Sequence, residues 1–385
     1  MNKIYFDHSA TTPVDEKVLA AMLPYFSKIY GNASSIHNFG QVAIRAVDDA
    51  REVVADFLGT KTNEIYFTSG ATESDNLAIL GLANLGEHII TTKIEHPAIL
   101  EAAQEMEKRG VQVTYLPVSQ EGLVSVEDVK NAVKENTRLI SVMYVNNEIG
   151  TIQPIAEIGQ WLKELNHNRE KRIYFHSDAV QATNYCEMNV DQLGVDMLSL
   201  SGHKIYGPKG IGVLYKRAGT PVRPHQFGGH QESSLRPGTL NVPGIVGLAE
   251  AIKQVMANKN DSEKIMKMRD RLVKEILAAI PNSQLNGDLI NRVPANAHFS
   301  FYGVEGESML ILLDQAGMAV STGSACSSGS LAPSHVLMAL GLEPLLAHGS
   351  LRITLGKDNT EKEIDILVKT LPPIIEKLRK ISPIK

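Results

Sequence analysis

The sequence contains few cysteines. Cys186 and Cys326 are the only two in 385 residues, so the fold does not depend on a disulfide framework. Two thiols in so long a chain suit a reducing compartment, where a thiol can be reactive. No apolar run approaches the ~20 residues of a membrane span, and residues 1–7 lack the apolar core of a signal peptide. We therefore expect a cytoplasmic protein that makes no membrane contact.

Strong charge of either sign is also missing. The 38 basic and 43 acidic residues give a net charge of -5, which argues against a nucleic-acid-binding surface. Hydrophobic residues make up 43% and charged residues 21%, as in ordinary globular proteins. This composition excludes disorder, collagen and a coiled coil. The length suggests two or three domains.

Short apolar runs alternate with helical patterns over the first two thirds of the chain. Several runs are apolar at consecutive positions, as in strands that are covered on both faces. Strands are predicted at 64–69, 88–92, 111–117, 139–145, 172–177, 196–201 and 211–215, and helices at 75–85, 97–110, 125–134 and 155–165. The alternation predicts an α/β fold with a mostly parallel sheet of seven strands.

The order of elements changes after about residue 250. The patterns predict a long charged helix at 246–277, strands at 297–302, 319–321 and 350–354, and helices at 308–316 and 360–379. Thr360 and Glu363 form a capping-box pattern at the start of the last helix. This mixed order predicts a smaller α+β domain in the C-terminal third.

Polar residues follow the strands at the edge where open α/β sheets bind ligands. The turn at 70–73 opens a helix and suits a phosphate, or is a plain tight turn. Asp178, directly after an apolar strand, needs a cationic partner unless it caps a helix. Lys204, after another apolar strand, would be nucleophilic toward a carbonyl if buried, and is otherwise a surface lysine.

Taken together, these three features are the anchors that pyridoxal phosphate requires: a phosphate turn, a carboxylate for a protonated ring nitrogen and a Schiff-base lysine. Two more strand ends fit the same cofactor. His96 could lie against the ring, although it could also simply start a helix before Pro97. Asn147 could serve the ring hydroxyl or a substrate carboxylate, although asparagine is also a common turn former.

The two cysteines differ in their surroundings. Residues 321–330 are nearly all small, which predicts a loop with Cys326 in its middle and favours a reactive thiol. Cys186 has no such setting, and we interpret it as incidental. Arg352, on a short predicted strand, suits bidentate capture of a substrate α-carboxylate.

These motifs resemble the cysteine desulfurases of the NifS and IscS type, in the class V aminotransferase group of pyridoxal phosphate enzymes. The resemblance covers essentially the whole chain. It rests on TSGATESDN (68–76), VNNEIGT (145–151), SGHKIYGPKG (201–210) and STGSACSSGS (321–330). It implies a fold type I transferase with a large cofactor-binding domain at 14–250. A smaller domain would comprise 1–13 and 251–385 and carry the catalytic Cys loop.

The resemblance also implies a role for each site residue. Lys204 would form the internal aldimine and act as the base at Cα, and His96 would stack on the ring and relay protons. Asp178 would keep the ring nitrogen protonated. Arg352 and Asn147 would bind the substrate carboxylate. Other cofactor contacts would come from Gln181 and Asn147 at the ring hydroxyl, from Ala71, Thr72, Ser201 and His203 at the phosphate, and from Thr239 of the other subunit of a homodimer.

The implied reaction converts L-cysteine to L-alanine. The Cys326 thiolate would attack the substrate sulfur and keep it as a persulfide for an acceptor protein in iron–sulfur cluster assembly or tRNA thiolation. No resident metal is expected, although Cys326 could transiently ligate an iron–sulfur cluster. Direct nucleic-acid binding is not expected. Selenocysteine stays open as a side substrate.

Some positions depart from the family pattern. Lys357 follows Gly356 where an arginine is common, and residues 228–234 differ in the expected dimer loop. The chain ends at Lys385 without the longer tail of IscS proteins, which favours a shorter NifS-like enzyme. Two alternatives remain: another class V aminotransferase or lyase, in which Cys326 has no role, and a sulfur-assembly scaffold that has lost turnover.

Overall fold

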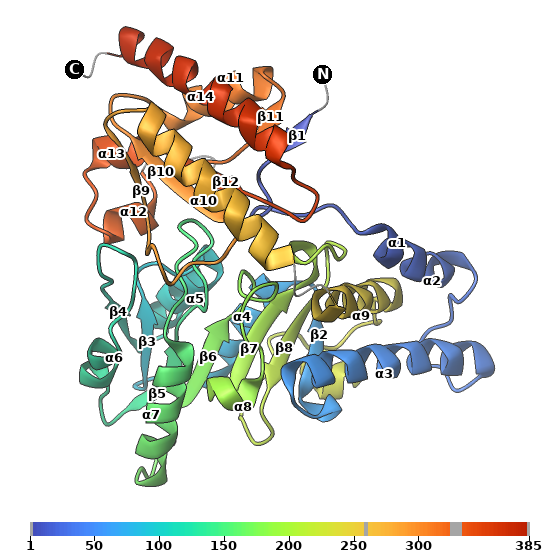
Figure 1. Ribbon diagram of the computed structural model, residues 1–385. Coiled ribbons are helices and arrows are strands. Elements are labelled where there is room, and N and C mark those ends of the chain that lie inside the picture. Colours follow the sequence, from blue (N-terminus) through green and yellow to red (C-terminus); the bar gives the residue numbers. More distant parts are fainter. Residues whose placement is uncertain (1–2, 258–260, 324–332, 383–385) are drawn as a thin grey trace.

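A computed structural model describes residues 3–257, 261–323 and 333–382. The larger part of the molecule is built on a seven-stranded sheet (Figure 1). Its strands are, in spatial order, β2 (Ile65–Thr68), β8 (Gly212–Lys216), β7 (Met197–Ser201), β6 (Tyr174–Asp178), β5 (Thr137–Ser141), β3 (His88–Thr92) and β4 (Gln112–Leu116). Strand β8 is antiparallel to both neighbours, and the other pairs are parallel. The predicted mostly parallel sheet is confirmed.

Helices cover both faces of this sheet. Neighbouring strand residues point to opposite faces. Leu198 of β7 accordingly packs with α3 (Asn38–Leu58), α7 (Ile155–His167) and α9 (Val242–Ala257). Met197 packs on the other side with α4 (Ala71–Leu82) and α5 (Pro97–Lys108). Burial on both faces explains why these strands are apolar at consecutive positions.

A second sheet has its own hydrophobic cluster. It is antiparallel in the order β12 (Ser350–Thr354), β10 (Asn296–Phe301), β9 (Ser283–Leu285). The helices α10 (Asp261–Ala279), α11 (Gly306–Gln315) and α14 (Glu361–Ile381) contribute to the cluster. In Figure 1 this unit lies above the larger sheet.

The N-terminus joins this second unit. Strand β1 (Ile4–Tyr5) pairs in parallel with β11 (Met318–Ala319), and Phe6 lies in the same hydrophobic cluster. The domain boundaries themselves stay a prediction. The remaining elements are α1 (Glu16–Met22), α2 (Pro24–Ser27), α6 (Val126–Ala132), α8 (Val190–Leu193), α12 (His335–Ala339), α13 (Pro344–His348) and short 3₁₀ turns at Thr62–Glu64, Gly202–Lys204 and Gln231–Ser234.

The prediction of one long helix at 246–277 is wrong. The structure has two helices, α9 and α10, whose axes point in different directions (Figure 1). The sequence between them, at 258–260, reads Asn-Lys-Asn and is followed by Asp261 and Ser262. Asparagine is a poor helix former, and Asp and Ser favour helix starts. The apolar spacing is also interrupted here, since no apolar residue occurs between Ala257 and Ile265.

The capping box predicted for the last helix is confirmed. Thr360 Oγ1 accepts a bond from Glu363 N, and Thr360 N donates to Glu363 Oε2 at 2.8 Å. We expect Thr360→Ala to lower the free energy of unfolding by about 1 kcal/mol, because an amide donor at the helix start loses its acceptor. Urea unfolding at unchanged slope measures the loss. Thr370→Ala, inside the same helix, is the control, and an equal effect there would contradict the cap as the cause.

Among the described residues, none of the helices combines the length and the apolarity required to cross a bilayer.

Candidate active site

A cavity of about 510 Å³ lies at the C-terminal edge of the seven-stranded sheet. This volume is in the range of cofactor and ligand pockets. Residues at or within a few positions of the C-terminal ends of β2, β3, β5, β6 and β7 contribute to its lining, as expected for an open α/β sheet. The predicted site residues that the structure brings together there are Ala71, Thr72, His96, Asn147, Asp178, Gln181, Ser201, His203, Lys204 and Arg352.

Lys204 lies in the short turn after β7 and points at the N-terminal segment. Its Nζ donates to the carbonyl of Ala10 at 2.7 Å and also to that of Ser9. Gln181 Nε2 donates to the same Ser9 carbonyl at 3.0 Å. Thr12 adds to the contact between the N-terminal segment and the turn of Lys204, because its N and Oγ1 both donate to the carbonyl of His203 at 2.9 Å. The sequence analysis assigned no role to these N-terminal carbonyls.

Asp178 ends β6 and is buried beside Lys204. Its Oδ1 accepts a bond from Val180 N at 2.9 Å. Burial raises the pKa of the Asp178 carboxyl, and the neighbouring His96 and Lys204 oppose this rise. A cation placed against the carboxylate would therefore be strongly stabilised. The protonated nitrogen of a pyridine ring is such a cation.

A second buried carboxyl, which the sequence analysis missed, lies close by on α4. Both side-chain oxygens of Asp75 lack a hydrogen-bond partner among the described residues. Burial, followed by the charge of Asp178, raises the Asp75 pKa well above its usual value. His176 Nε2 is 3.7 Å from Asp75 Oδ1, but burial lowers the His176 pKa to about 3, so the ring supplies no charge. The raised pKa of Asp75 favours its neutral form, whereas the neighbouring His96 and Lys204 favour the anionic form of Asp178.

The turn from β2 into α4 lines the cavity with the start of a helix. The first amide groups of a helix have no acceptor within it, and they carry the positive end of the helix dipole. Ser201 and His203 line the same cavity from the end of β7. A Cβ on Gly212 would lie 2.7 Å from Gly70 Cα, so only glycine lets β8 approach the turn so closely. The amide groups at the start of α4, together with the side chains of Ser201 and His203, fit a phosphate group.

His96 is held with its ring in one orientation. It caps α5, and Nδ1 accepts a bond from Ala98 N at 3.1 Å, which assigns the ring proton to Nε2. Burial lowers the pKa of His96. The preceding Glu95 is fully buried, and its pKa is raised by burial to about 8. When Glu95 is neutral, it provides no negative charge to the neighbouring His96 ring.

Arg352, on β12, reaches the cavity from the second sheet. Its Nη1 donates to the Asn147 carbonyl at 3.0 Å, and Nη2 donates to Asp7 Oδ1 at 3.0 Å. Its buried Nε has no partner among the described residues. A fixed guanidinium with a spare donor is suited to an α-carboxylate.

Two predicted site residues are not in the described lining of this cavity. Thr239 is exposed on the surface, and Cys326 falls outside the described residues. The segment that carries Cys326 is nevertheless attached beside the cavity at both ends. Ser321 exchanges backbone hydrogen bonds of 2.7 and 3.1 Å with Arg352, and His335 Nε2 lies 2.9 Å from the Glu95 carbonyl.

The donor set fits pyridoxal phosphate. One cavity contains an amine that can bind the aldehyde, a buried carboxylate for the ring nitrogen and a helix start for the phosphate. Asp178 in particular is buried, and a protonated ring nitrogen would place a positive charge against its carboxylate. The described part of the chain contains no group of three or more His, Cys, Asp or Glu side chains that could hold a metal ion.

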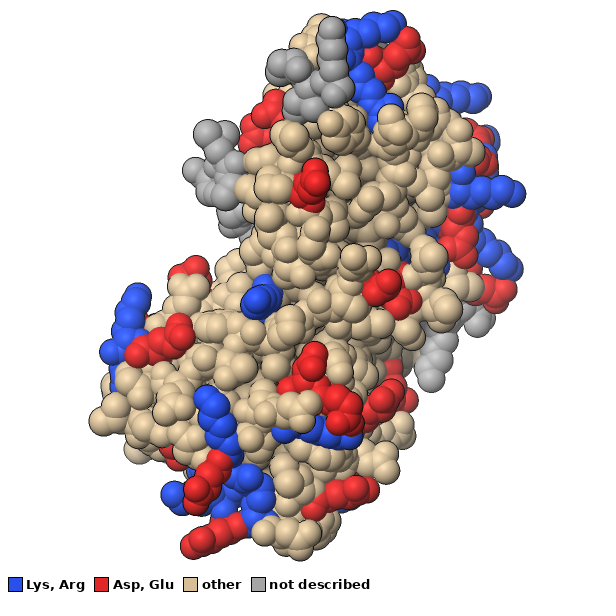
Figure 2. All heavy atoms as spheres, turned by 90° about the vertical axis from the view of Figure 1, so that its left-hand side faces the viewer, with Lys and Arg blue, Asp and Glu red and all other residues tan. Residues whose placement is uncertain are grey.

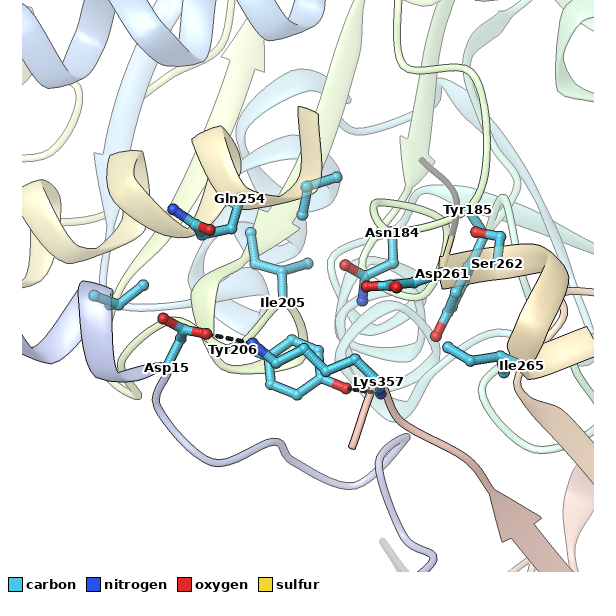
Figure 3. Close-up of a pocket in the computed structure, with 12 residues that line it drawn as sticks. Asp15, Asn184, Tyr185, Ile205, Tyr206, Gln254, Asp261, Ser262, Ile265 and Lys357 are labelled. Carbon is cyan, nitrogen blue, oxygen red and sulfur yellow. Dashed lines mark hydrogen bonds and ion pairs between the residues drawn. The ribbon is translucent and has the colours of Figure 1, made fainter. Parts of the chain in front are cut away.

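A second hollow lies next to the turn of Lys204 (Figure 3). Its volume of about 50 Å³ is too small for a cofactor. Lys357 forms an ion pair with Asp15 there, and its backbone N donates to Tyr206 Oη at 2.9 Å. The lysine that departs from the family pattern therefore connects the end of β12 to the N-terminal segment.

The comparisons with known proteins agree with this chemistry. The family model "Aminotransferase class-V" matches residues 4–367. The chain is 51% identical to Cysteine desulfurase IscS of Clostridium botulinum, over 100% of this chain and 97% of the relative. It is 49% identical to Cysteine desulfurase IscS of Methanosarcina thermophila, over 99% and 94%.

Solved structures are similar over nearly the full length. A NifS-like protein superposes with a TM-score of 0.88 at 37% identity, covering 97% of this chain and 100% of that chain. The structure described as SspA in complex with cysteine superposes with a TM-score of 0.81 at 37% identity, covering 93% and 100%.

Proposed function

The chain belongs to the class V aminotransferases and is a pyridoxal phosphate-dependent cysteine desulfurase, and we propose that Cys326 receives the sulfur of L-cysteine as a persulfide. The observation that carries the proposal is the attachment of both ends of the Cys326 segment beside the cavity, at Arg352 and at the carbonyl of Glu95. The described residues that flank this segment thus lie beside the cavity that Lys204 and Asp178 line.

The cofactor would be held by residues that the fold brings to one edge of the sheet. Lys204 would bind it covalently, Asp178 would pair with its ring nitrogen, and Gln181 and Asn147 would serve its ring hydroxyl. The start of α4 would hold its phosphate together with Ser201 and His203. When bound, the cofactor supplies an electron sink for the pair left at the substrate Cα.

The protein's own groups position the substrate and move its protons. Arg352 would bind the α-carboxylate of cysteine, with Asn147 beside it. The amine of Lys204 would remove the Cα proton. His96 presents Nε2 for proton relay because Nδ1 is already bonded to the start of α5.

The sulfur transfer balances without an added oxidant. The Cys326 thiolate attacks the substrate sulfur, an S–S bond forms, and the bond between Cβ and sulfur breaks. The electron pair of the broken bond stays with carbon and takes up a proton. The products are L-alanine and a persulfide on Cys326.

We also propose that the enzyme is a homodimer. Large apolar side chains are exposed in and around the N-terminal helices, including Ile36 at 94% just before α3. Phe227 is 90% exposed, and the next residue, Gly228, lies against Pro237. Such a surface is typical of an interaction site. If a partner subunit covered this apolar surface, the exposed Thr239 would reach the phosphate site in the partner subunit's cavity.

The sulfur acceptor proposed here is a protein of iron–sulfur assembly or tRNA thiolation, with the enzyme acting in the reducing cytoplasm. On the face that Figure 2 shows, basic and acidic side chains lie side by side at both ends of the molecule, and the area between them carries few charges. Nucleic acid prefers a continuous basic surface. This favours a protein as the immediate acceptor.

Labelled sulfur tests the proposal. The enzyme is given cysteine with isotopically labelled sulfur, the thiols are alkylated, and the peptides are mapped by mass. We expect label on the peptide that contains Cys326, with one alanine formed per labelled site in a single turnover. Label on the Cys186 peptide, or pyruvate and ammonia in place of alanine, would contradict the proposal and favour a lyase.

A further inference from the structure

Glu148 is a buried carboxyl that the proposed mechanism does not use. It follows Asn147, and only 4% of the residue is exposed. Its Oε2 accepts a hydrogen bond from Ser334 Oγ at 2.5 Å. The same Ser334 oxygen caps α12 by accepting a bond from Leu337 N at 3.3 Å. Glu148 thus holds the residue from which α12 starts.

The same carboxyl also contacts the chain on the other side of residues 324–332. A Cβ built on Gly323 would lie 2.6 Å from Glu148 Oε2 and 3.2 Å from Ser334 Cβ. The Gly323 backbone therefore lies directly against the carboxyl, and a side chain there would displace it. One side chain touches both Gly323 and Ser334, which flank the segment carrying Cys326.

Glu148 is itself fixed to the substrate side of the cavity. Its backbone carbonyl accepts a bond from Asn296 Nδ2 at 2.8 Å, and the preceding Asn147 carbonyl accepts from Arg352 Nη1 at 3.0 Å. The contact from Glu148 to Ser334 therefore joins the cysteine-bearing segment to the carboxylate-binding arginine.

Burial favours the neutral form of the Glu148 carboxyl. Burial raises the pKa of Glu148 to about 7, and Ser334 and Arg352 oppose this rise. His298 on β10, the other titratable group that faces Gly323, has its pKa lowered by burial to about 3 and adds no charge. A neutral, isosteric glutamine can therefore replace Glu148 and still accept the bond from Ser334.

From this geometry we propose that Glu148 is a positioning residue for sulfur transfer. By binding Ser334 and supporting Gly323, it holds both ends of the Cys326 segment relative to Arg352. It contributes to the step in which Cys326 attacks the substrate sulfur and not to the binding of cysteine. The proposal rests on the role of Cys326 given above.

A double-mutant cycle tests it, with Glu148→Ala, Ser334→Ala and the double variant in the holoenzyme. We expect each single variant to slow persulfide formation on Cys326 in a single turnover by about tenfold, the loss that ~1.4 kcal/mol of orientation represents. The double variant should be no slower than the singles, because both remove one interaction. KM for cysteine and the absorbance change on adding cysteine should stay as in the wild type.

Three variants separate positioning from other effects. Glu148→Gln keeps the acceptor and should restore the rate. Ser125→Ala removes a similar cap, from α6, where Ser125 Oγ accepts from Asp128 N at 3.3 Å, and should not slow the transfer. Gly323→Ala should reproduce the Glu148→Ala defect by displacing the carboxyl.

Hydrogen exchange gives a readout that is independent of turnover. In Glu148→Ala, the amides of Ser321 and Leu337 should exchange faster while those of β6 are unchanged. Wild-type transfer rates in both single variants, or a double variant slowed by the product of the single effects, would overturn the proposal. So would a rise in KM that accounts for the whole loss. Failure of the Cys326 role is seen separately, as full desulfuration by Cys326→Ser.

Discussion

Replacing Lys204 with alanine is expected to lower the turnover of cysteine by at least about 10⁴-fold. In the proposed mechanism, the amine of Lys204 would both bind the cofactor covalently and remove the Cα proton. Its Nζ is held by the Ser9 and Ala10 carbonyls, so it approaches the cavity from a fixed direction. Alanine has no base and no nucleophile at this position.

Two measurements make the loss interpretable. Borohydride reduction should fix the cofactor to the peptide containing Lys204 in the wild type and leave no such link in Lys204→Ala. Lys204→Arg keeps a positive charge and donors for the two carbonyls, but a guanidinium is neither deprotonated nor nucleophilic. It should be as inactive as Lys204→Ala. Turnover by Lys204→Arg would show that the charge is what matters and would contradict the assigned role.

The contact between Lys204 and the N-terminal carbonyls could not be predicted from the sequence. The donor and the two acceptors are 195 and 194 residues apart in the chain. Local patterns report burial and helix or strand periodicity within a few residues, and they contain no information on such a distant contact. The pairing of β1 with β11, which brings the N-terminal segment to this side, is distant in the same way.

The strands of the large sheet could be predicted because their signal is local in the sequence. Buried parallel strands appear as short β-branched runs, and each can be recognised without knowledge of its neighbours. Polar residues at their ends then predicted the cavity, because parallel strands end at one edge of the sheet. All the described candidates lie there except Thr239, whose proposed role is in the partner subunit's cavity.

Other features had a local signal that was not used. Helix α3 has buried apolar residues at helical spacing, Ala43, Val47, Ala50 and Val54, and ends at Gly59 in the left-handed conformation. This helix was not predicted, although its apolar spacing can be recognised in the sequence. Asp75 lies within the TSGATESDN motif on α4, but its burial depends on strands far away in sequence.

Cys326→Ser is expected to lower alanine formation from cysteine by at least about 10³-fold while the visible absorbance of the bound cofactor is unchanged. Serine is close to cysteine in size, and its hydroxyl does not supply a thiolate that can attack sulfur. The protein should still bind cysteine through Arg352, so the absorbance change on adding substrate should remain. Alanine by amino-acid analysis and sulfide by a colorimetric assay measure the loss.

Cys186→Ser is the matched control because Cys186 cannot replace the missing thiol. Burial raises the pKa of Cys186 to about 12, which leaves only ~10⁻⁵ of it as thiolate at pH 7. It lies with Glu187 and Met188 in a different hollow from that of Lys204. We therefore expect wild-type turnover from Cys186→Ser. Full turnover by Cys326→Ser would exclude Cys326 as the acceptor. Loss of turnover in Cys186→Ser would indicate that the persulfide forms on Cys186 and would contradict the proposal. The small-residue segment flanked by Gly323 and Ser334 would then need another function.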